Sequence, residues 1–127
     1  TLPNAIPSAE EMAVNLMWHK RQKGWNVHEE LKRQMAKEFE SGGMLFSVDG
    51  SLVMLGHAAR NPRAVRHITT RYGSKSMTEI EIKAINDLVD ARGTAIQDNA
   101  ASLNALVDAA VDVAAVNAID TTTGWPS

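Results

Sequence analysis

The chain has 127 residues, of which 44% are hydrophobic and 22% are charged, and its formal net charge is −2. This length and composition predict one soluble domain with a modest core. The absence of cysteine excludes disulfides, zinc–thiolate sites and a cysteine nucleophile. No apolar run approaches the roughly 18 residues of a membrane span, and the opening residues lack the pattern of a secretory signal.

The charge is unevenly distributed along the chain. Residues 1–77 carry 11 Lys/Arg against 7 Asp/Glu, a net of +4, whereas residues 78–127 carry 2 against 8, a net of −6. Such halves can attract each other within a chain or between copies, so this asymmetry bears on association and not on fold.

The N-terminal third predicts an extended arm and then a helical pair. Residues 1–7 contain two prolines and no periodicity, so they are expected to form the arm, and residues 8–127 a single small domain. Ser8 opens a capping box that starts a first helix, which Gly24 ends. Asn26 caps a second helix to about residue 40, so the pair covers residues 8–41. The second helix carries a stripe of apolar residues every four positions: Val27, Leu31, Met35 and Phe39.

The middle of the chain predicts a β-hairpin over residues 44–55. Asp49 and Gly50 separate two β-prone runs, and Asp-Gly is a strong signal for a two-residue hairpin turn. Residues 56–77 allow two interpretations. One is a helix that starts at Asn61-Pro62, and the other is a turn of helix followed by a strand at about residues 67–71. The hairpin and this basic segment together span residues 44–76.

The last third predicts a long helix over residues 78–110, then a short helix at 112–119 and a tail. Thr78 and Glu81 form a capping box. Gly93 marks a place where the long helix could bend or break. Its seam steps by three and four residues in a heptad-like pattern, in which the polar Arg92 and Asn99 interrupt apolar residues: Ile85, Val89, Arg92, Ile96, Asn99, Leu103, Leu106 and Ala110. The fold class predicted for the whole chain is therefore α+β and mostly helical.

Three tryptophans are the strongest candidates for protein contact. Trp125 lies between Gly124 and Pro126, where neither helix nor strand continues easily, so its ring is expected to fold back into a pocket or to dock on a partner. Large rings supply much of the energy at interfaces. We predict an interface that includes the tryptophans and the middle of the seam: Trp18, Trp25, Ile96, Leu103 and Trp125.

The sequence carries no clear catalytic or ligand-binding motif. His19 and His28 with the nearby Glu29 could form a two-histidine, one-carboxylate metal site, but solvated or capping histidines are the simpler interpretation. The acids of the long helix have no nucleophile or glycine loop near them, which favours a solvated acidic face. We therefore expect no enzyme activity, no cofactor and no metal.

A basic stretch between residues 60 and 75 could neutralise phosphates. The chain as a whole is mildly acidic, which argues against a nucleic-acid partner. The alternative is a salt-bridging surface that faces the acidic half of a neighbouring molecule. The residues of this predicted electrostatic contact are Arg60, Arg63, Arg66 and Arg71.

Several C-terminal segments together resemble a known family. These are residues 77–81, 85–88, 103–110 and 113–120 and the Gly-Trp-Pro at 124–126. Over about residues 77–126 the chain resembles the C-terminal domain of unknown function found in many tailed-bacteriophage tail-fibre and tail-fibre-assembly proteins. Residues 31–50 are more weakly similar to the opening of that domain. The segment before Thr78 departs from the family, which carries a longer stretch with a Trp there.

The resemblance implies a non-enzymatic structural component of a phage virion tail, made in the host cytoplasm. It would attach or organise tail fibres or baseplate elements by protein–protein packing. Its partners would be other tail or fibre proteins and further copies of the chain. Two alternatives remain open: a dissociable tail-fibre assembly chaperone, and a small nucleic-acid-binding protein.

Overall fold

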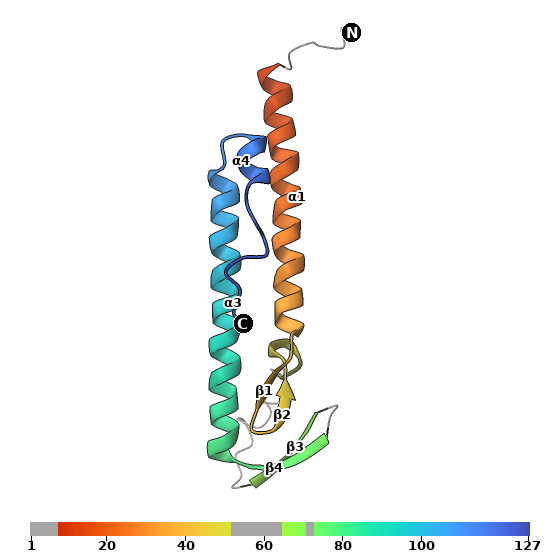
Figure 1. The fold of residues 1–127 in the computed structure, drawn as a ribbon, viewed down its shortest axis with the longest axis vertical. Helices are drawn as coiled ribbons and strands as arrows, with labels where there is room; N and C mark the ends of the chain where they lie inside the picture. The colour runs from red at the N-terminus through yellow and green to blue at the C-terminus, as the bar shows by residue number, and fades with distance from the viewer. Residues whose placement is uncertain (1–7, 52–64, 71–72) are drawn as a thin grey trace.

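The computed structural model describes residues 8–51, 65–70 and 73–127. It shows a mostly helical α+β fold in which two long antiparallel helices, α1 (Ala9–Ala36) and α3 (Glu79–Ala109), lie side by side (Figure 1). Two small hairpins lie at one end of the helices, and α4 (Val113–Asn117) packs on α1 towards the other end. None of the described helices is long and apolar enough to cross a membrane. The predicted arm, residues 1–7, lies outside the described residues.

The predicted helical pair is wrong, because α1 is a single helix of 28 residues. Ser8 caps it as expected, since its side chain accepts a hydrogen bond from the Glu11 amide at 3.1 Å. Gly24 lies inside the helix, and Asn26 caps nothing there. A helix-interior glycine costs only about 1 kcal/mol relative to alanine. The packing of α1 along α3 offsets that cost, with Val27 almost fully buried close by.

The Asp-Gly hairpin over residues 44–55 is also wrong. The hairpin that forms pairs β1 (Phe39–Ser41) with β2 (Met44–Phe46), and its turn is Gly42-Gly43, with φ of 60° and 81°. Residues 48–51 are helical, so Asp49 and Gly50 lie in a helical turn. Ser47 explains the difference, because its hydroxyl accepts from the Gly50 amide at 3.1 Å and acts as a helix cap. Residues 52–55 lie outside the described part.

A second hairpin pairs β3 (Val65–Thr70) with β4 (Gly73–Thr78). The strand interpretation of this segment is therefore confirmed for residues 65–70, although the strand starts earlier than predicted. Lys75 ties the two hairpins together, since its ammonium donates to the Gly42 carbonyl at 2.7 Å. Ile68 and Met77 are buried against the N-terminal half of the long C-terminal helix α3.

The long C-terminal helix is confirmed as one unbroken element of 31 residues, and Thr78 and Glu81 form the predicted capping box. Gly93 does not break α3. It lets the 48–51 turn approach, because a Cβ at this position would lie 3.2 Å from a methyl of Val48. The seam drifts from the predicted heptad in its second half: Leu106 is 56% exposed and Val107 is buried in its place. The residues of α3 that are buried are Ile82, Ile85, Val89, Ile96, Ala100, Leu103 and Val107.

Candidate interaction surface

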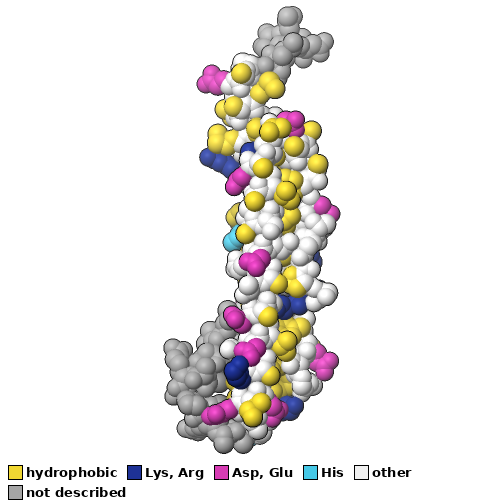
Figure 2. All heavy atoms as spheres, turned by 90° about the vertical axis from the view of Figure 1, so that its left-hand side faces the viewer, with side chains coloured by type: hydrophobic (Ala, Val, Ile, Leu, Met, Phe, Trp, Pro, Cys, Tyr) yellow, Lys and Arg dark blue, Asp and Glu magenta, His cyan; other side chains and the backbone are white. Residues whose placement is uncertain are grey.

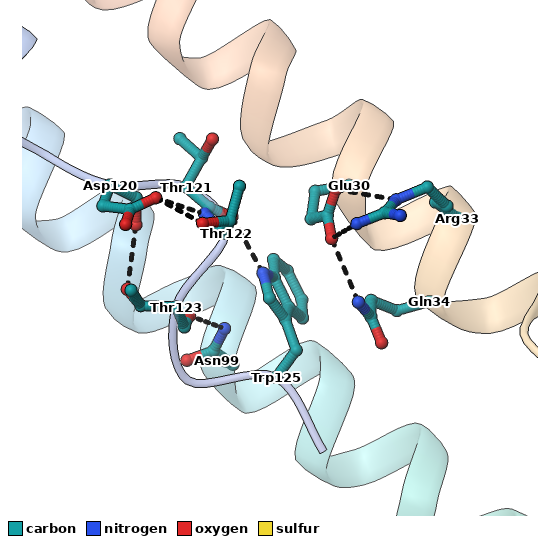
Figure 3. A network of polar contacts seen from close by, with 9 residues as sticks. All are labelled: Glu30, Arg33, Gln34, Asn99, Asp120, Thr121, Thr122, Thr123 and Trp125. Carbon is teal, nitrogen blue, oxygen red and sulfur yellow. Dashed lines mark hydrogen bonds and ion pairs between the residues drawn. The ribbon is translucent and has the colours of Figure 1, made fainter. Parts of the chain in front are cut away.

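The tail after α4 closes over the groove between α1 and α3, and Trp125 is the residue that fills it (Figure 3). Its ring packs against both hydrophobic clusters, which contain Ile96 and Leu103 respectively. The indole Nε1 donates to the Thr121 carbonyl at 2.8 Å, so its one polar atom is satisfied within the tail. Of the two outcomes expected for Trp125, the structure shows the first, a ring folded onto its own chain.

A small set of polar contacts fixes the path of the tail. Asn99 on α3 donates to the Thr123 carbonyl at 2.9 Å, and Gly124 follows with φ of 84°. A Cβ on Gly124 would collide with the Asn99 amide, so the close approach requires glycine. Asp120 closes the turn before it by accepting from the amide and the hydroxyl of Thr122 at 2.9 and 2.6 Å. These hydrogen bonds lower the pKa of Asp120.

Cationic side chains of the two long helices donate hydrogen bonds to main-chain oxygens. Lys20 donates to the Asp108 carbonyl at 2.8 Å, and Lys23 donates to the Ile119 carbonyl at 3.0 Å. Both lysines lie on α1, and the oxygens that they reach are near the end of α3 and after α4. Carbonyls at a helix end lack intrahelical partners, so the lysine at Asp108 satisfies one of them. Arg92 likewise donates to the Ser127 main-chain oxygen at 2.7 Å while its guanidinium lies over the Phe39 ring.

Glu30 and Arg33 form the main polar cluster on α1 beside the tail (Figure 3). Arg33 binds both carboxylate oxygens of Glu30, and Gln34 donates to the same carboxylate at 3.0 Å. The hydrogen bond from Arg33 lowers the pKa of Glu30, and that from Gln34 acts in the same direction. This cluster is an electrostatic support for α1. It contains no nucleophile or metal site.

The surface left open by this closure is apolar and belongs to α1. Val14, Trp18 and Trp25 are 58%, 56% and 60% exposed, on side chains that a folded chain usually covers. Met17 is also exposed beside them. We call these four residues the α1 apolar surface. Exposed apolar groups gathered on one element are typical of interaction sites.

A groove of about 560 Å³ lies on a different side of α1, where α1 extends beyond α3. Its apolar walls are Met12 and Leu16 on α1 and Val111 and Val113 around the start of α4. Figure 2 shows hydrophobic side chains along the length of the face that carries α3, with acidic side chains scattered among them. The groove is a second, concave and mainly apolar site, separate from the α1 apolar surface.

The predicted interface residues divide into two groups. Ile96 and Leu103 are 0% and 4% exposed and lie inside the chain's own core, so they present no surface to a partner while the chain has this fold, and Trp125 packs against the same two clusters. Trp18 and Trp25 are exposed at the surface of one continuous helix. Val14 was not among the predicted residues, although it lies four residues before Trp18 on the same face of the helix.

The predicted electrostatic contact cannot be located in the structure. Arg60, Arg63 and Arg71 lie outside the described residues, and only the backbone of Arg66 is described, in β3 opposite Met77. The histidine site does not assemble either: His19 bonds the Asn15 carbonyl, and His28 lies against Trp25. Within residues 8–51, 65–70 and 73–127, no group of three His, Cys, Asp or Glu side chains could hold a metal ion.

Comparison with known proteins adds no relative. The chain matches no protein-family model, no curated protein and no solved structure. Its candidate function therefore depends on the α1 apolar surface and on the separate apolar groove of α1.

Proposed function

We propose that the chain is a non-enzymatic structural component of a tailed-phage virion, which attaches or organises tail fibres or baseplate elements by protein–protein packing. The observation that carries this proposal is the α1 apolar surface, on which two tryptophans stay more than half exposed. Tryptophan is enriched among the residues that dominate binding energy at interfaces. A protein partner that covers these rings would remove apolar area from water, which is favourable.

The polar residues support the same proposal. The polar contacts around the tail are structural: Lys20 and Lys23 donate to carbonyls, Asn99 holds the tail, and Arg33 pairs with Glu30 within α1. None of them converges on a cavity as an acid–base or nucleophilic pair would. The tail location itself comes from the resemblance of residues 77–126 to the phage tail-fibre family.

The proposal is tested by incorporation into particles. A phage that encodes the chain would be grown with either the natural sequence or the double variant Trp18→Ser/Trp25→Ser, and purified particles would be quantified by mass spectrometry against a major tail protein. We expect the natural chain at a fixed copy number and at least a tenfold loss of the variant. Ile80→Ser is the matched control, because Ile80 is 83% exposed on α3 and away from the α1 apolar surface.

Two results would count against the proposal. Normal incorporation of the double variant would show that the α1 apolar surface is not the attachment site. A natural chain that is abundant in the infected cell but absent from particles would replace the structural role with that of a dissociable assembly chaperone. Far-UV circular dichroism of the purified variants checks that α1 still forms.

A further inference from the structure

The two exposed tryptophans of α1 occupy equivalent positions on the helix. Trp18 and Trp25 are seven residues apart, which is close to two full turns, so both rings project from one face. By helix geometry this face is about 160–180° around the axis from Val27, the buried residue that contacts the rest of the fold. Val14 lies further towards the N-terminus of this face, with the same degree of exposure. We call Val14, Trp18 and Trp25 the tryptophan ridge. The ridge therefore points away from α3.

The charges at the two ends of this ridge are opposite. Glu10 and Glu11 lie in the first turn of α1, and Arg33 lies in its last turn, just after Lys32. The side chains of Lys32 and Arg33 are 55% and 70% exposed, so each can accept a second acidic neighbour besides the glutamate that it already pairs with. A parallel copy would place like charges against each other at both ends. An antiparallel copy would place acids against bases at both ends.

Deepening the proposed function, on which this inference rests, we propose that the partner of the tryptophan ridge is a second copy of this chain, bound antiparallel about a two-fold axis. The axis passes between Arg21 and Gln22, halfway between the tryptophans. Trp18 of one copy then lies level with Trp25 of the second copy, and the same contact repeats across the axis. Glu11 of each copy reaches the level of Lys32 of the other. Such an interface is isologous and closes at a dimer.

The size of the contact sets its strength. The paired segment from Glu11 to Lys32 is about 32 Å long at a rise of 1.5 Å per residue. A single helix–helix contact of this length lies at the low end of specific interfaces, so the dimer forms reversibly with concentration. The groove lined by Met12, Leu16, Val111 and Val113 is on the other side of α1 and stays free for a different tail protein.

Sedimentation equilibrium of the whole chain tests this pairing directly. We expect a monomer–dimer equilibrium whose association constant falls at least tenfold in Trp18→Ser and in Trp25→Ser. Glu10→Lys/Glu11→Lys weakens an antiparallel dimer, because both ends then repel, and so does Lys32→Glu/Arg33→Glu. An equimolar mixture of these two charge variants restores dimerisation. A chain that stays monomeric up to millimolar concentration overturns the proposal.

Single cysteines distinguish the orientation, since the natural chain has none. Gln22→Cys puts the only thiol beside the axis, and oxidised glutathione is expected to convert it to a disulfide-linked dimer. Glu29→Cys is the control, because antiparallel pairing separates its two copies by roughly 22 Å along the axis. Cross-linking of both variants indicates a parallel dimer, and cross-linking of neither indicates that the ridge does not bind its own copy. Either result overturns the proposal.

The particle experiment separates this inference from the proposed function. A monomeric chain whose incorporation still depends on Trp18 and Trp25 contradicts the dimer and leaves the structural role in place, with a different protein on the ridge. A dimer with the predicted cross-link, whose tryptophan variants are incorporated normally, supports the pairing and contradicts the attachment role of the surface.

Discussion

Replacing Trp125 by alanine is expected to destabilise the fold because this ring joins the tail to both long helices. It packs against the cluster around Ile96 and against the cluster around Leu103, and it donates one hydrogen bond to the Thr121 carbonyl. Removal of the ring leaves the groove between α1 and α3 uncovered on the tail side. The tail then loses the side chain that holds it against the two helices.

The magnitude follows from the area that the ring covers. A tryptophan buries about 150–250 Å² when it is fully enclosed, and Trp125 is partly buried. Loss of about 120 Å² at 25 cal/mol per Å² gives roughly 3 kcal/mol. The hydrogen bond to the Thr121 carbonyl adds little, because water can replace the indole as donor. We therefore expect a loss of about 3 kcal/mol in the free energy of unfolding.

Urea denaturation followed by far-UV circular dichroism measures this loss. Trp18→Ala is the matched control: it removes the same ring from an exposed position on α1, and we expect a change within about 0.5 kcal/mol. The measurement is made at a protein concentration low enough to keep the chain monomeric. Equal midpoints for Trp125→Ala and Trp18→Ala would refute the reasoning that the tail is closed by its tryptophan.

Three further predictions follow from the backbone and the tail. Gly24→Ala should raise the free energy of unfolding by about 0.5–1 kcal/mol, because a Cβ there meets no atom within 4 Å. A lower stability of this variant in thermal denaturation would instead indicate that Gly24 ends a helix in the left-handed conformation. Gly124→Ala should cost about 2 kcal/mol in the same assay, since its φ is 84° and the new methyl would collide with the Asn99 side chain; an unchanged stability would contradict the tail path. The pKa of Asp120 lies below its ordinary value of 3.8 in the folded chain, so its stabilising contribution is complete above that pH and is lost as the pH falls through the folded pKa. In a variant that keeps Trp125 as its sole tryptophan, lowering the pH through the folded pKa of Asp120 should therefore shift the tryptophan fluorescence. Asp120→Asn should abolish the part of this shift that comes from protonation of Asp120.

Two of the three predicted capping signals mark true helix starts, and the third, Asn26, lies inside α1. Ser8 and Thr78 each begin a helix as their sequence context indicates, because a capping hydrogen bond involves residues only three apart. The length of α3 was predictable for a similar reason: no proline interrupts its periodic apolar residues. The β-branched residues at 65–70 also allowed a strand as one of two alternatives, and a strand forms.

The failures arose where tertiary packing decided between local alternatives. Gly24 looks like a helix stop, yet α1 continues through it because its far half packs on α3. Asp49-Gly50 looks like a hairpin turn, but Ser47 offers a competing helix cap and Gly42-Gly43 makes a turn of its own. No signal within either segment shows which alternative the rest of the chain stabilises.

The candidate surface was predictable only in part. The sequence singled out Trp18 and Trp25 but placed Trp25 between two predicted helices, and only the continuous α1 brings both rings onto one helix face. The burial of Ile96 and Leu103 was not predictable either, because an apolar seam can pack on its own chain or on another. Only the position of α1 shows that this seam is already occupied.

Hydroxyl-radical labelling of the three tryptophans in the free chain and in the purified particle tests the central claim most directly. The claim is that Trp125 packs the tail against the two long helices, whereas Trp18 and Trp25 stay exposed until a protein partner covers them. We predict that Trp125 is labelled slowly in both states, and that Trp18 and Trp25 are labelled fast in the dilute chain and become protected in the particle. Fast labelling of Trp125 in the free chain, or equally fast labelling of Trp18 and Trp25 in the particle, would contradict the account.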